Sequence, residues 1–333
     1  MRCDSVPLYV QMGLPATYAR PVAENLLEAA RAIKGETQGG LLEIMSDRQR
    51  QLPVRIAAGL RVALEGWRPQ PILGPLMLDV PRGTASIGTE PNEVAQVVAE
   101  YAAVGVKEVW IRKETPRHSV ELAPYRIAKY PVTCDEFAQF CAATGSAHLP
   151  STWNVGRRFH PADANTPVSG VSLESAEAYC RWLSGETGRS FHLPTECEWE
   201  FAAAGPQRLE FPWGNQFDPD CANTLEINLR MPSPVGVFPG GASWVGAMDL
   251  AGNVEEWTSS RIGDGYPGGV VVEEDLVEAL GFNYPVCRGG SFCRFADLAR
   301  CRRRHGPYPG VLYPIGFRLA EHVVINHRKG ENK

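Results

Sequence analysis

The residues best suited to chemistry lie in a short segment near the end of the chain. This segment carries the only concentrated group of basic residues in a chain of formal net charge −5: Arg294, Arg300, Arg302, Arg303, Arg304 and His305. If the segment is extended, alternation places Arg300, Arg302 and Arg304 on one side and Arg303 on the other. The pattern therefore predicts a locally basic surface on an otherwise acidic protein.

Aromatic residues are interleaved with these cations. Exposed guanidinium groups beside aromatic rings can bind a carboxylate, a phosphate or an acidic peptide. We therefore predict a ligand-binding surface on the loop 291–314, made by Phe292, Arg294, Phe295, Arg302, Arg303, His305 and Tyr308. An ordinary solvated surface is the alternative that the residues leave open.

Thiols are the second candidate for chemistry. The nine cysteines are spread from Cys3 to Cys301 without CxxC spacing. An odd number without paired spacing argues against a disulfide framework and against a zinc knuckle. We expect most of them to be small buried apolar residues.

Other catalytic patterns are weak. The seven histidines are scattered, none pairs at helical metal spacing, and His118 and His192 are expected to be structural. Glu196, Glu198 and Glu200 are expected to cap a helix and to form internal salt bridges. The sequence contains no GxSxG, no P-loop, and no GxGxxG followed by a helix.

Composition limits the partners. A formal net charge of −5 gives no general attraction to nucleic acid or to an anionic membrane. No run of about 18 apolar residues and no signal-like start is present, so we expect a cytoplasmic protein. The 33 glycines, 27 prolines and 8 tryptophans indicate many turns around short elements.

Residues 1–70 are predicted to form a helical N-terminal extension that packs on the rest of the protein or mediates assembly. Apolar periodicity predicts helices over Ala19–Gly35 and Gln49–Trp67. The proline-rich stretch Arg68–Pro75 cannot continue a helix. The main domain is expected over 71–320, followed by a polar tail at 321–333.

The main domain is predicted to be α+β with little regular structure. Short strands are expected near residues 76–80, 84–88, 118–122, 125–130, 286–288 and 316–320. A helix is expected over Glu93–Val109, with three further helices at 134–144, after Ser172, and after Thr195. The stretch after Gly205 reads mostly as loop.

A series of motifs now identifies a relationship. They are, in order, PRHSVEL from Pro116, YRIAKYPVT, PVSGVSLESAEAYCRWLS, FHLPTECEWEFAAAG, FPWGN, AMDLAGNVEEW, CRGGSF and IGFRLA. Over about residues 76–320 the chain resembles the formylglycine-generating enzyme (sulfatase-modifying factor) family. The resemblance implies a C-type-lectin-like fold. It also implies that Arg300 and Arg304 are internal and structural, as the matching arginines of the family commonly are. Residues 1–70 fall outside it.

The resemblance also implies structural calcium. The family's matching residues suggest Asn253 and Glu256 as ligands in the segment Asp249–Trp257. The alternative is that Asn253 ties a turn. A second calcium position would match Asn223 and Thr224, but Gly236 stands where well-studied members have a carboxylate, so this second site is in doubt.

The chain departs from the family at its redox centre. Members resemble one another in a pair of cysteines five positions apart after GGS, which binds one copper ion. Here Cys293 lies one position too early, and Cys301 matches a structural cysteine of the family. The related sulfur–histidine oxygenases use three histidines, and this chain has none before His118. We therefore expect neither copper nor iron.

Two functions follow from the resemblance. The first is a binding module, a lectin-like scaffold that presents residues 291–314 to a ligand, as the variable proteins of diversity-generating retroelements do. The second is a metal-dependent oxygenase related to formylglycine generation with altered ligands, in which Cys293 and Cys301 would be catalytic. The sequence favours the first, because the copper ligands are missing.

Overall fold

The computed structural model of the chain describes residues 22–145, 149–153, 159–264, 266–267, 271–307 and 314–323. Within these ranges no helix is long and apolar enough to cross a membrane. The tail expected at 321–333 begins inside a strand, because Glu321 and His322 belong to β9. Residues 324–333 lie outside the described ranges.

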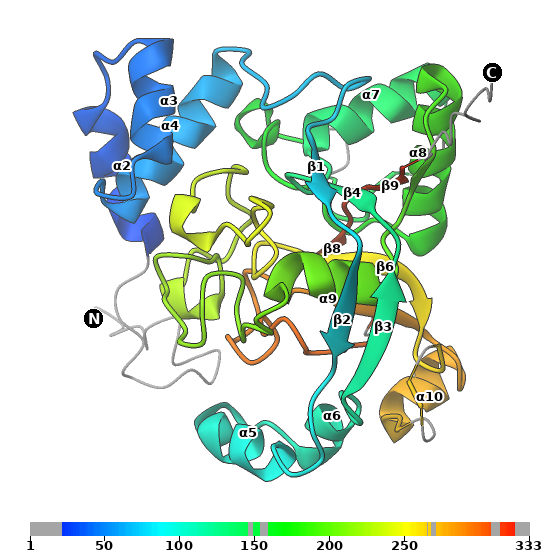
Figure 1. Ribbon diagram of the computed structural model, residues 1–333. Coiled ribbons are helices and arrows are strands. Elements are labelled where there is room, and N and C mark those ends of the chain that lie inside the picture. The colour runs from blue at the N-terminus through cyan, green and yellow to red at the C-terminus, as the bar shows by residue number, and fades with distance from the viewer. Residues whose placement is uncertain are drawn as a thin grey trace, which may run out of the picture.

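Three helices open the described chain (Figure 1): α2 (Val22–Ala32), α3 (Gln38–Ser46) and α4 (Leu52–Leu64). The helices predicted at 19–35 and 49–67 are confirmed as α2 and α4, whereas α3 was not predicted. Helix α3 begins where the side chain of Thr37 accepts a hydrogen bond of 3.2 Å from the backbone N–H of Gly40. This is an ordinary N-cap, which satisfies one of the otherwise unpaired N–H groups.

These helices pack on the rest of the protein. Ile56 and its apolar neighbours form one buried cluster with Phe238. The fully buried Arg55 donates a 2.8 Å hydrogen bond to the carbonyl of Val237 and forms an ion pair with Asp220. A buried guanidinium needs such partners, so Arg55 links α4 to the loop that follows residue 230.

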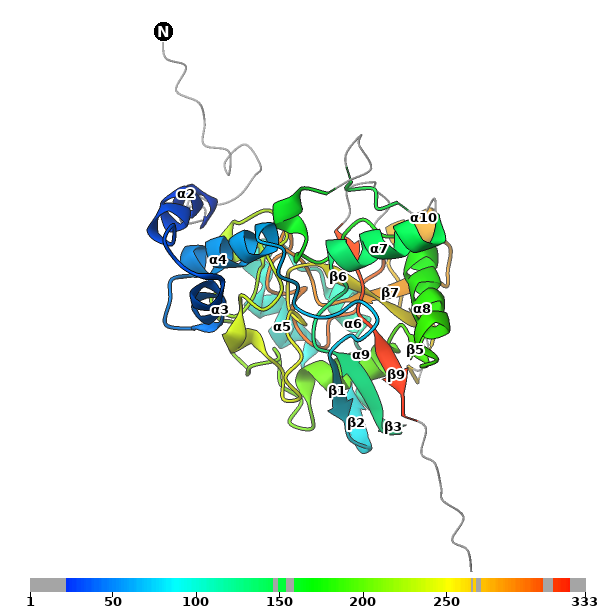
Figure 2. The same ribbon diagram turned by 90° about the horizontal axis from the view of Figure 1, so that it is seen from above.

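The described strands form three small sheets. The largest is antiparallel and has the order β1 (Met77–Val80), β4 (Tyr125–Ala128), β9 (Ala320–His322) and β5 (Phe191–His192). A two-stranded ribbon pairs β2 (Gly83–Ile87) with β3 (His118–Leu122). The third sheet has the order β7 (Pro285–Arg288), β6 (Glu255–Arg261) and β8 (Ile315–Gly316). Figure 2 shows β5 and β9 side by side at one edge of the molecule.

Three further helices begin at capped ends, two of them at the caps that the sequence predicts, Ser172 and Thr195. They are α7 (Cys134–Thr144), α8 (Leu173–Thr187) and α9 (Glu196–Ala204). Thr133 and Glu136 form a capping box on α7, the side chain of Ser172 caps α8, and Thr195 and Glu198 form a capping box on α9. These local hydrogen bonds fix where each helix starts.

The helix predicted over 93–109 is wrong as a single element. The chain instead forms α5 (Val94–Glu100), the 3-10 turn η1 (Ala102–Val104) and α6 (Glu108–Arg112). Gly105 separates them with a φ of 78°, a left-handed conformation that ends a helical run. The break turns α6, and with it Trp110, into a new direction.

Two elements occur where loop was expected, namely β6 and the helix α10 (Glu274–Leu280). The strand expected at 316–320 is split between β8 and β9. The remaining single turns are η2 (Pro161–Asp163), η3 (Leu225–Ile227) and η4 (Pro239–Gly241). The prediction of an α+β domain of short elements is confirmed.

Two apolar clusters hold the main domain together. One gathers aromatic rings between α7 and α8, where Phe137, Tyr179 and Phe317 pack against each other. The other surrounds Trp199 and includes Cys301. Of the eight cysteines described, six are buried and none forms a disulfide. The exposed exception is Cys293, in the segment where chemistry was expected.

Candidate functional site

The segment 291–305 folds as a series of turns. Backbone N–H groups of Arg294, Leu298 and Arg303 donate to carbonyls three residues earlier, at 2.9, 3.1 and 3.0 Å. At its end, His305 returns to the third sheet, where its carbonyl accepts a 2.7 Å hydrogen bond from Cys287. The predicted extended alternation is therefore wrong, and each arginine has its own direction.

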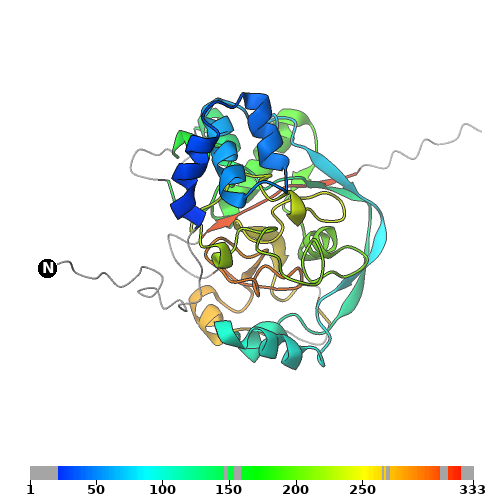
Figure 3. The same ribbon diagram turned by 90° about the vertical axis from the view of Figure 1, so that its left-hand side faces the viewer.

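One pocket, with a volume of about 370 Å³, collects residues from this segment. The segment contributes Cys293, Arg294, Phe295, Asp297, Leu298, Arg303 and His305. The opposite wall comes from Val104 and Trp110 near α6, and from Glu273 and Asp275 at the start of α10. Figure 3 shows the teal α5–α6 region and the orange α10 at the same end of the molecule.

The two guanidinium groups of the pocket are both paired with carboxylates. Arg294 is about one-third exposed, and its Nε lies 3.3 Å from Glu255. Arg303 is only 2% exposed, lies 3.8 Å from Asp297, and donates a 3.1 Å hydrogen bond to the carbonyl of Trp110. Since Arg303 was expected to be exposed, that prediction is wrong. Arg303 is a wall of the pocket and Arg294 its more accessible cation.

His305 is neutral at pH 7. Burial lowers its pKa well below the usual value, and the positive charges of Lys113, Arg303 and Arg294 lower the pKa further. A neutral imidazole can donate or accept a hydrogen bond, but it adds no charge to the pocket. The prediction of a strongly basic surface is therefore not supported at this residue.

Two of the predicted ligand-binding residues, Phe292 and Arg302, do not line this pocket. Phe292 is half-buried and donates its backbone N–H to the carbonyl of Asn253 at 3.1 Å. Arg302 forms ion pairs with Glu210 and Glu93 instead of facing a ligand. Tyr308 lies outside the described residues.

The two cysteines of this segment have different environments. Cys293 is exposed, lines the pocket, and lies 3.5 Å from the hydroxyl of Ser291. Cys301 is fully buried in the cluster around Trp199 and does not line the pocket. Burial raises the pKa of both thiols, and that of Cys301 most strongly, so neither is a ready thiolate at neutral pH.

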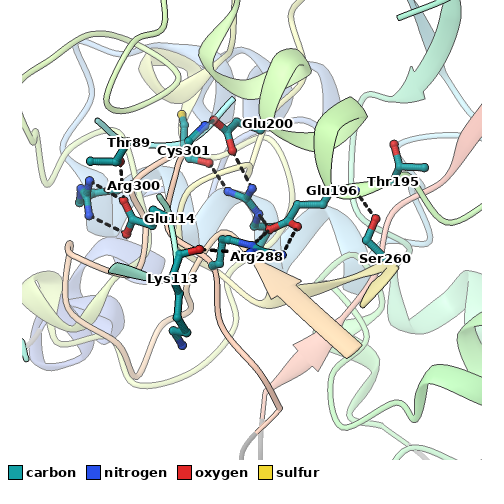
Figure 4. A network of polar contacts seen from close by, with 12 residues as sticks. Thr89, Lys113, Glu114, Thr195, Glu196, Glu200, Ser260, Arg288, Arg300 and Cys301 are labelled. Atoms are coloured by element: carbon teal, nitrogen blue, oxygen red, sulfur yellow. Dashed lines mark hydrogen bonds and ion pairs between the residues drawn. The ribbon is translucent and has the colours of Figure 1, made fainter. Parts of the chain in front are cut away.

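Arg300 and Arg304 belong to a buried ion-pair network (Figure 4). Arg300 contacts Glu114 through two hydrogen bonds of 3.0 and 3.1 Å, and Arg304 contacts Glu196 through two of 2.7 and 2.8 Å. Arg288 pairs with Glu196 as well, at 2.9 Å. The expectation that Arg300 and Arg304 are internal is confirmed.

The acidic residues of α9 have the roles that the sequence predicts. Glu198 belongs to the capping box, and Glu200 accepts a 2.6 Å hydrogen bond from Arg288. Burial raises the pKa of Glu196, but the charges of Arg304 and Arg288 outweigh it and hold the pKa below its usual value. These carboxylates are structural partners of arginine.

Comparison with known proteins identifies the family to which this architecture belongs. A family model described as the sulfatase-modifying factor enzyme 1-like domain matches residues 67–323. The chain belongs to this family. The match begins close to the end of α4, so the three N-terminal helices lie before it. The fold is accordingly the C-type-lectin-like α+β fold of this family, as predicted.

Relatives of different names share the domain. The hercynine oxygenase of Mycobacterium tuberculosis is 33% identical over an alignment of 227 residues, and the match covers 59% of this chain and 52% of that protein. The inactive C-alpha-formylglycine-generating enzyme 2 of Bos taurus is 42% identical over an alignment of 171 residues, and the match covers 46% of this chain and 50% of that protein. The chain thus matches about half the length of these curated relatives.

Among solved structures, PvdO from Pseudomonas aeruginosa superimposes with a TM-score of 0.57 and 25% sequence identity. The superposition covers 75% of this chain and 95% of PvdO. The family framework is therefore present almost in full.

The residues suggested for calcium by family resemblance are engaged elsewhere. Asn253 accepts a 2.9 Å hydrogen bond from the backbone of Ser233, and its amide donates to the Ser233 carbonyl and to Asp249. With a φ of 65°, Asn253 lies in the left-handed region of a turn. This geometry supports the alternative that Asn253 ties a turn.

Glu256 is committed to an ion pair. Its two carboxylate oxygens accept hydrogen bonds of 2.6 and 2.7 Å from Arg318, and Oε2 also accepts the indole N–H of Trp199 at 2.7 Å. A bidentate guanidinium supplies the positive charge that the prediction assigned to calcium. Glu256 is thus engaged with Arg318 and Trp199, and its role as a calcium ligand stays a prediction.

At the second calcium position, the amide of Asn223 donates to the Met231 carbonyl at 3.0 Å and to the hydroxyl of Ser233 at 3.2 Å. Its buried Oδ1 accepts no hydrogen bond from the described residues. Thr224 is also fully buried. Calcium at this position stays a prediction, now carried by Asn223.

One group of residues was missed by the sequence analysis. Among the described residues, a single group of three histidine, cysteine or acidic side chains brings its ligand atoms within 4.8 Å of one another, namely His192, Glu198 and His322. His192 and His322 are 130 positions apart, so no local spacing reveals them. Neither residue lies in a strand expected from the sequence, so only the pairing of β5 with β9 reveals the group.

Proposed function

We propose that this chain is a ligand-binding member of its family and that the pocket at residues 293–305 is its recognition site. The observation that carries the proposal is the convergence of Cys293, Arg294, Phe295, Arg303 and His305 on one cavity of about 370 Å³. Cavities of this size suit small molecules. The wall is formed by residues of a turn-rich segment supported by a rigid buried network, which is a common basis for recognition.

The placement of the cysteines supports binding over copper chemistry. Two thiolates on one copper ion require both sulfur atoms to face the same cavity. Cys293 faces the pocket, whereas Cys301 lies in the apolar core. The 42% identity to a relative named as inactive supports the same proposal.

The pocket favours a ligand that carries both charges. Arg294 and Arg303 are matched by nearby carboxylates, while Asp275 is exposed at the wall formed by α10. The ligands expected from the sequence were a carboxylate, a phosphate or an acidic peptide, and a ligand with negative charge alone would be repelled by Asp275. We therefore propose a zwitterionic small molecule, with its acidic group toward Arg294 and its apolar body against Trp110.

The test is a binding screen with the purified full chain. Amino acids and betaines serve as zwitterionic probes, and dicarboxylates and sugar phosphates as purely anionic ones, measured by thermal shift and calorimetry. Arg294→Ala is expected to weaken binding of a zwitterionic hit about tenfold or more, because a charged hydrogen bond is lost. Arg82→Ala, an exposed arginine in the turn between β1 and β2, is the matched control.

If Arg294→Ala binds the zwitterionic hit as tightly as Arg82→Ala does, the pocket at residues 293–305 is not the recognition site. A hit confined to sugar phosphates or dicarboxylates would replace the zwitterion with an anionic ligand.

The 33% identity to a hercynine oxygenase supports a second candidate, an oxygenase with altered metal ligands. It is tested by measuring copper, iron and calcium separately in the purified protein, together with oxygen uptake in the presence of Cu(I) or Fe(II). Stoichiometric redox metal, with oxygen uptake lost in Cys293→Ser, would establish this candidate. The binding proposal expects neither.

A further inference from the structure

A second cluster lies away from the pocket, on the four-stranded sheet. Strands β5 and β9 are antiparallel neighbours in which His192 faces Ala320. Side chains two residues apart on a strand share a face, so His322 lies diagonally beside His192 on the same face of the sheet. Glu198 approaches from the first turn of α9. Three elements distant in sequence thus meet at one point.

The side chains are close enough to share one ion. The two imidazole rings stack with centroids 4.0 Å apart and an interplanar angle of 19°. Nε2 of His192 lies 3.8 Å from Oε2 of Glu198, and the ligand atoms of all three residues lie within 4.8 Å of one another. Ligand atoms around a tetrahedral zinc ion are about 3.3 Å apart, given bonds of about 2.0 Å. Shifts of about 1 Å would close the site.

The ring of His192 is set for a metal. Its Nδ1 lies 3.4 Å from the carbonyl of Ser190, which can accept a hydrogen bond from an N–H on that nitrogen. In that tautomer the lone pair is on Nε2, which is buried and makes no hydrogen bond with the described residues. An outer carbonyl that fixes the tautomer is the usual arrangement behind a metal-binding histidine.

We propose that His192, Glu198 and His322 form a binding site for a divalent transition-metal ion of the zinc class. Two imidazoles and one carboxylate are borderline ligands that suit Zn²⁺, Ni²⁺ or Cu²⁺, whereas Ca²⁺ and Mg²⁺ prefer oxygen alone. Three protein ligands leave a fourth position for water or a partner's side chain. The site is independent of the pocket and of the function proposed for it.

Binding requires two small adjustments. Parallel stacked rings cannot both direct a lone pair at one ion, so His322 must turn out of the stack, and its exposed position permits this. The capping box already uses Oε2 of Glu198, which accepts from the backbone and the hydroxyl of Thr195 at 2.8 and 2.9 Å. The ion would therefore be held through Oε1, and the cap of α9 would remain intact.

The test uses untagged, chelator-treated full-length protein titrated with Zn²⁺ by calorimetry. Wild-type protein is expected to bind one equivalent and to show a raised thermal midpoint. His322→Ala removes an exposed ligand without touching the core, and is expected to weaken Zn²⁺ binding at least tenfold. His160→Ala is the control, because His160 is exposed and lies on a different element, at the start of η2.

A second measurement separates this site from loosely bound surface zinc. Co²⁺ is expected to give the intense visible absorption of a four-coordinate site in wild type and in His160→Ala, and to lose it in His322→Ala and in His192→Gln. An unchanged thermal midpoint of metal-free His322→Ala shows that the variant is folded. No one-equivalent binding in wild type, or binding equally strong in His322→Ala, would overturn the proposal.

Discussion

The two sides of the segment 291–305 use the same residue types for opposite purposes. On the pocket side, Arg294 remains about one-third exposed beside an exposed Cys293. On the core side, Arg300 and Cys301 are both fully buried. The comparison shows that an arginine-rich sequence does not by itself make a basic surface. On the core side, Arg300 and Arg304 pair with the buried carboxylates of Glu114 and Glu196.

The network explains why the core side tolerates this charge. Glu196 forms ion pairs with both Arg288 and Arg304, and Glu114 forms an ion pair with Arg300. Burying an unpaired charge is very costly, so a buried arginine persists only with hydrogen-bonded partners. Arg303 marks the boundary, since it lines the pocket and yet is almost fully buried.

The largest effect is expected from Glu196→Gln. The change keeps the shape of the side chain but leaves Arg304 and part of the charge of Arg288 without a carboxylate. Breaking such a buried pair costs about 3–5 kcal/mol in the free energy of unfolding. Urea denaturation monitored by tryptophan fluorescence measures this cost.

The control is Glu177→Gln, which removes an exposed pair with Arg181 at 3.8 Å on α8. That variant is expected to lose less than about 0.5 kcal/mol. Similar losses for the two variants would mean that the core side is no different from the surface.

A smaller difference in unfolding free energy is expected between serine variants of Cys301 and Cys293. Cys301→Ser places a hydroxyl in the apolar cluster around Trp199 and is expected to cost about 1–3 kcal/mol of unfolding free energy. Cys293→Ser, on the exposed side of the same segment, is expected to stay within about 0.5 kcal/mol of wild type. Denaturant midpoints of the two variants, measured in parallel, make the comparison. Equal midpoints would show that both thiols have the same environment.

The smallest expected effect is on the pH dependence of the unfolding free energy, through His305. The pKa of His305 is held well below its ordinary value of 6.5 by burial and by Lys113, Arg303 and Arg294. The unfolded chain therefore binds a proton that the folded chain does not, and this contribution to stability falls as pH drops below about 6.5. His305→Gln is expected to flatten the slope of unfolding free energy between pH 7 and 5.

Denaturation curves at several pH values test this, with His160→Gln as the control. If the slope of His305→Gln matches that of wild type, the imidazole is not held neutral by the pocket.

Much of the fold could be predicted from local signals. The caps at Thr133, Ser172 and Thr195 each depend on hydrogen bonds to a residue three positions away, so sequence spacing is sufficient to find them. The family motifs likewise predicted the α+β fold. The helix over 93–109 was predicted too long because its apolar stripe continues past Gly105, where the backbone turns left-handed.

The candidate site was predicted in part. Arg294, Phe295, Arg303 and His305 do line one pocket, but the opposite wall at Trp110 and Glu273 could not be predicted from the segment itself. The direction of Arg300, for example, depends on Glu210 and Glu114, carboxylates that lie 90 and 186 positions away along the chain.

The sequence alone determined what neighbouring residues decide together: helix starts, the short strands, family membership, and the offset of Cys293 from the copper-binding pattern. Tertiary structure alone decided which arginines are buried, that Cys301 lies in the core, and that His192 meets His322 across two strands. The reason is the range of the interactions. Caps and turns act over a few residues, whereas burial and ion pairing depend on where distant parts of the chain come together.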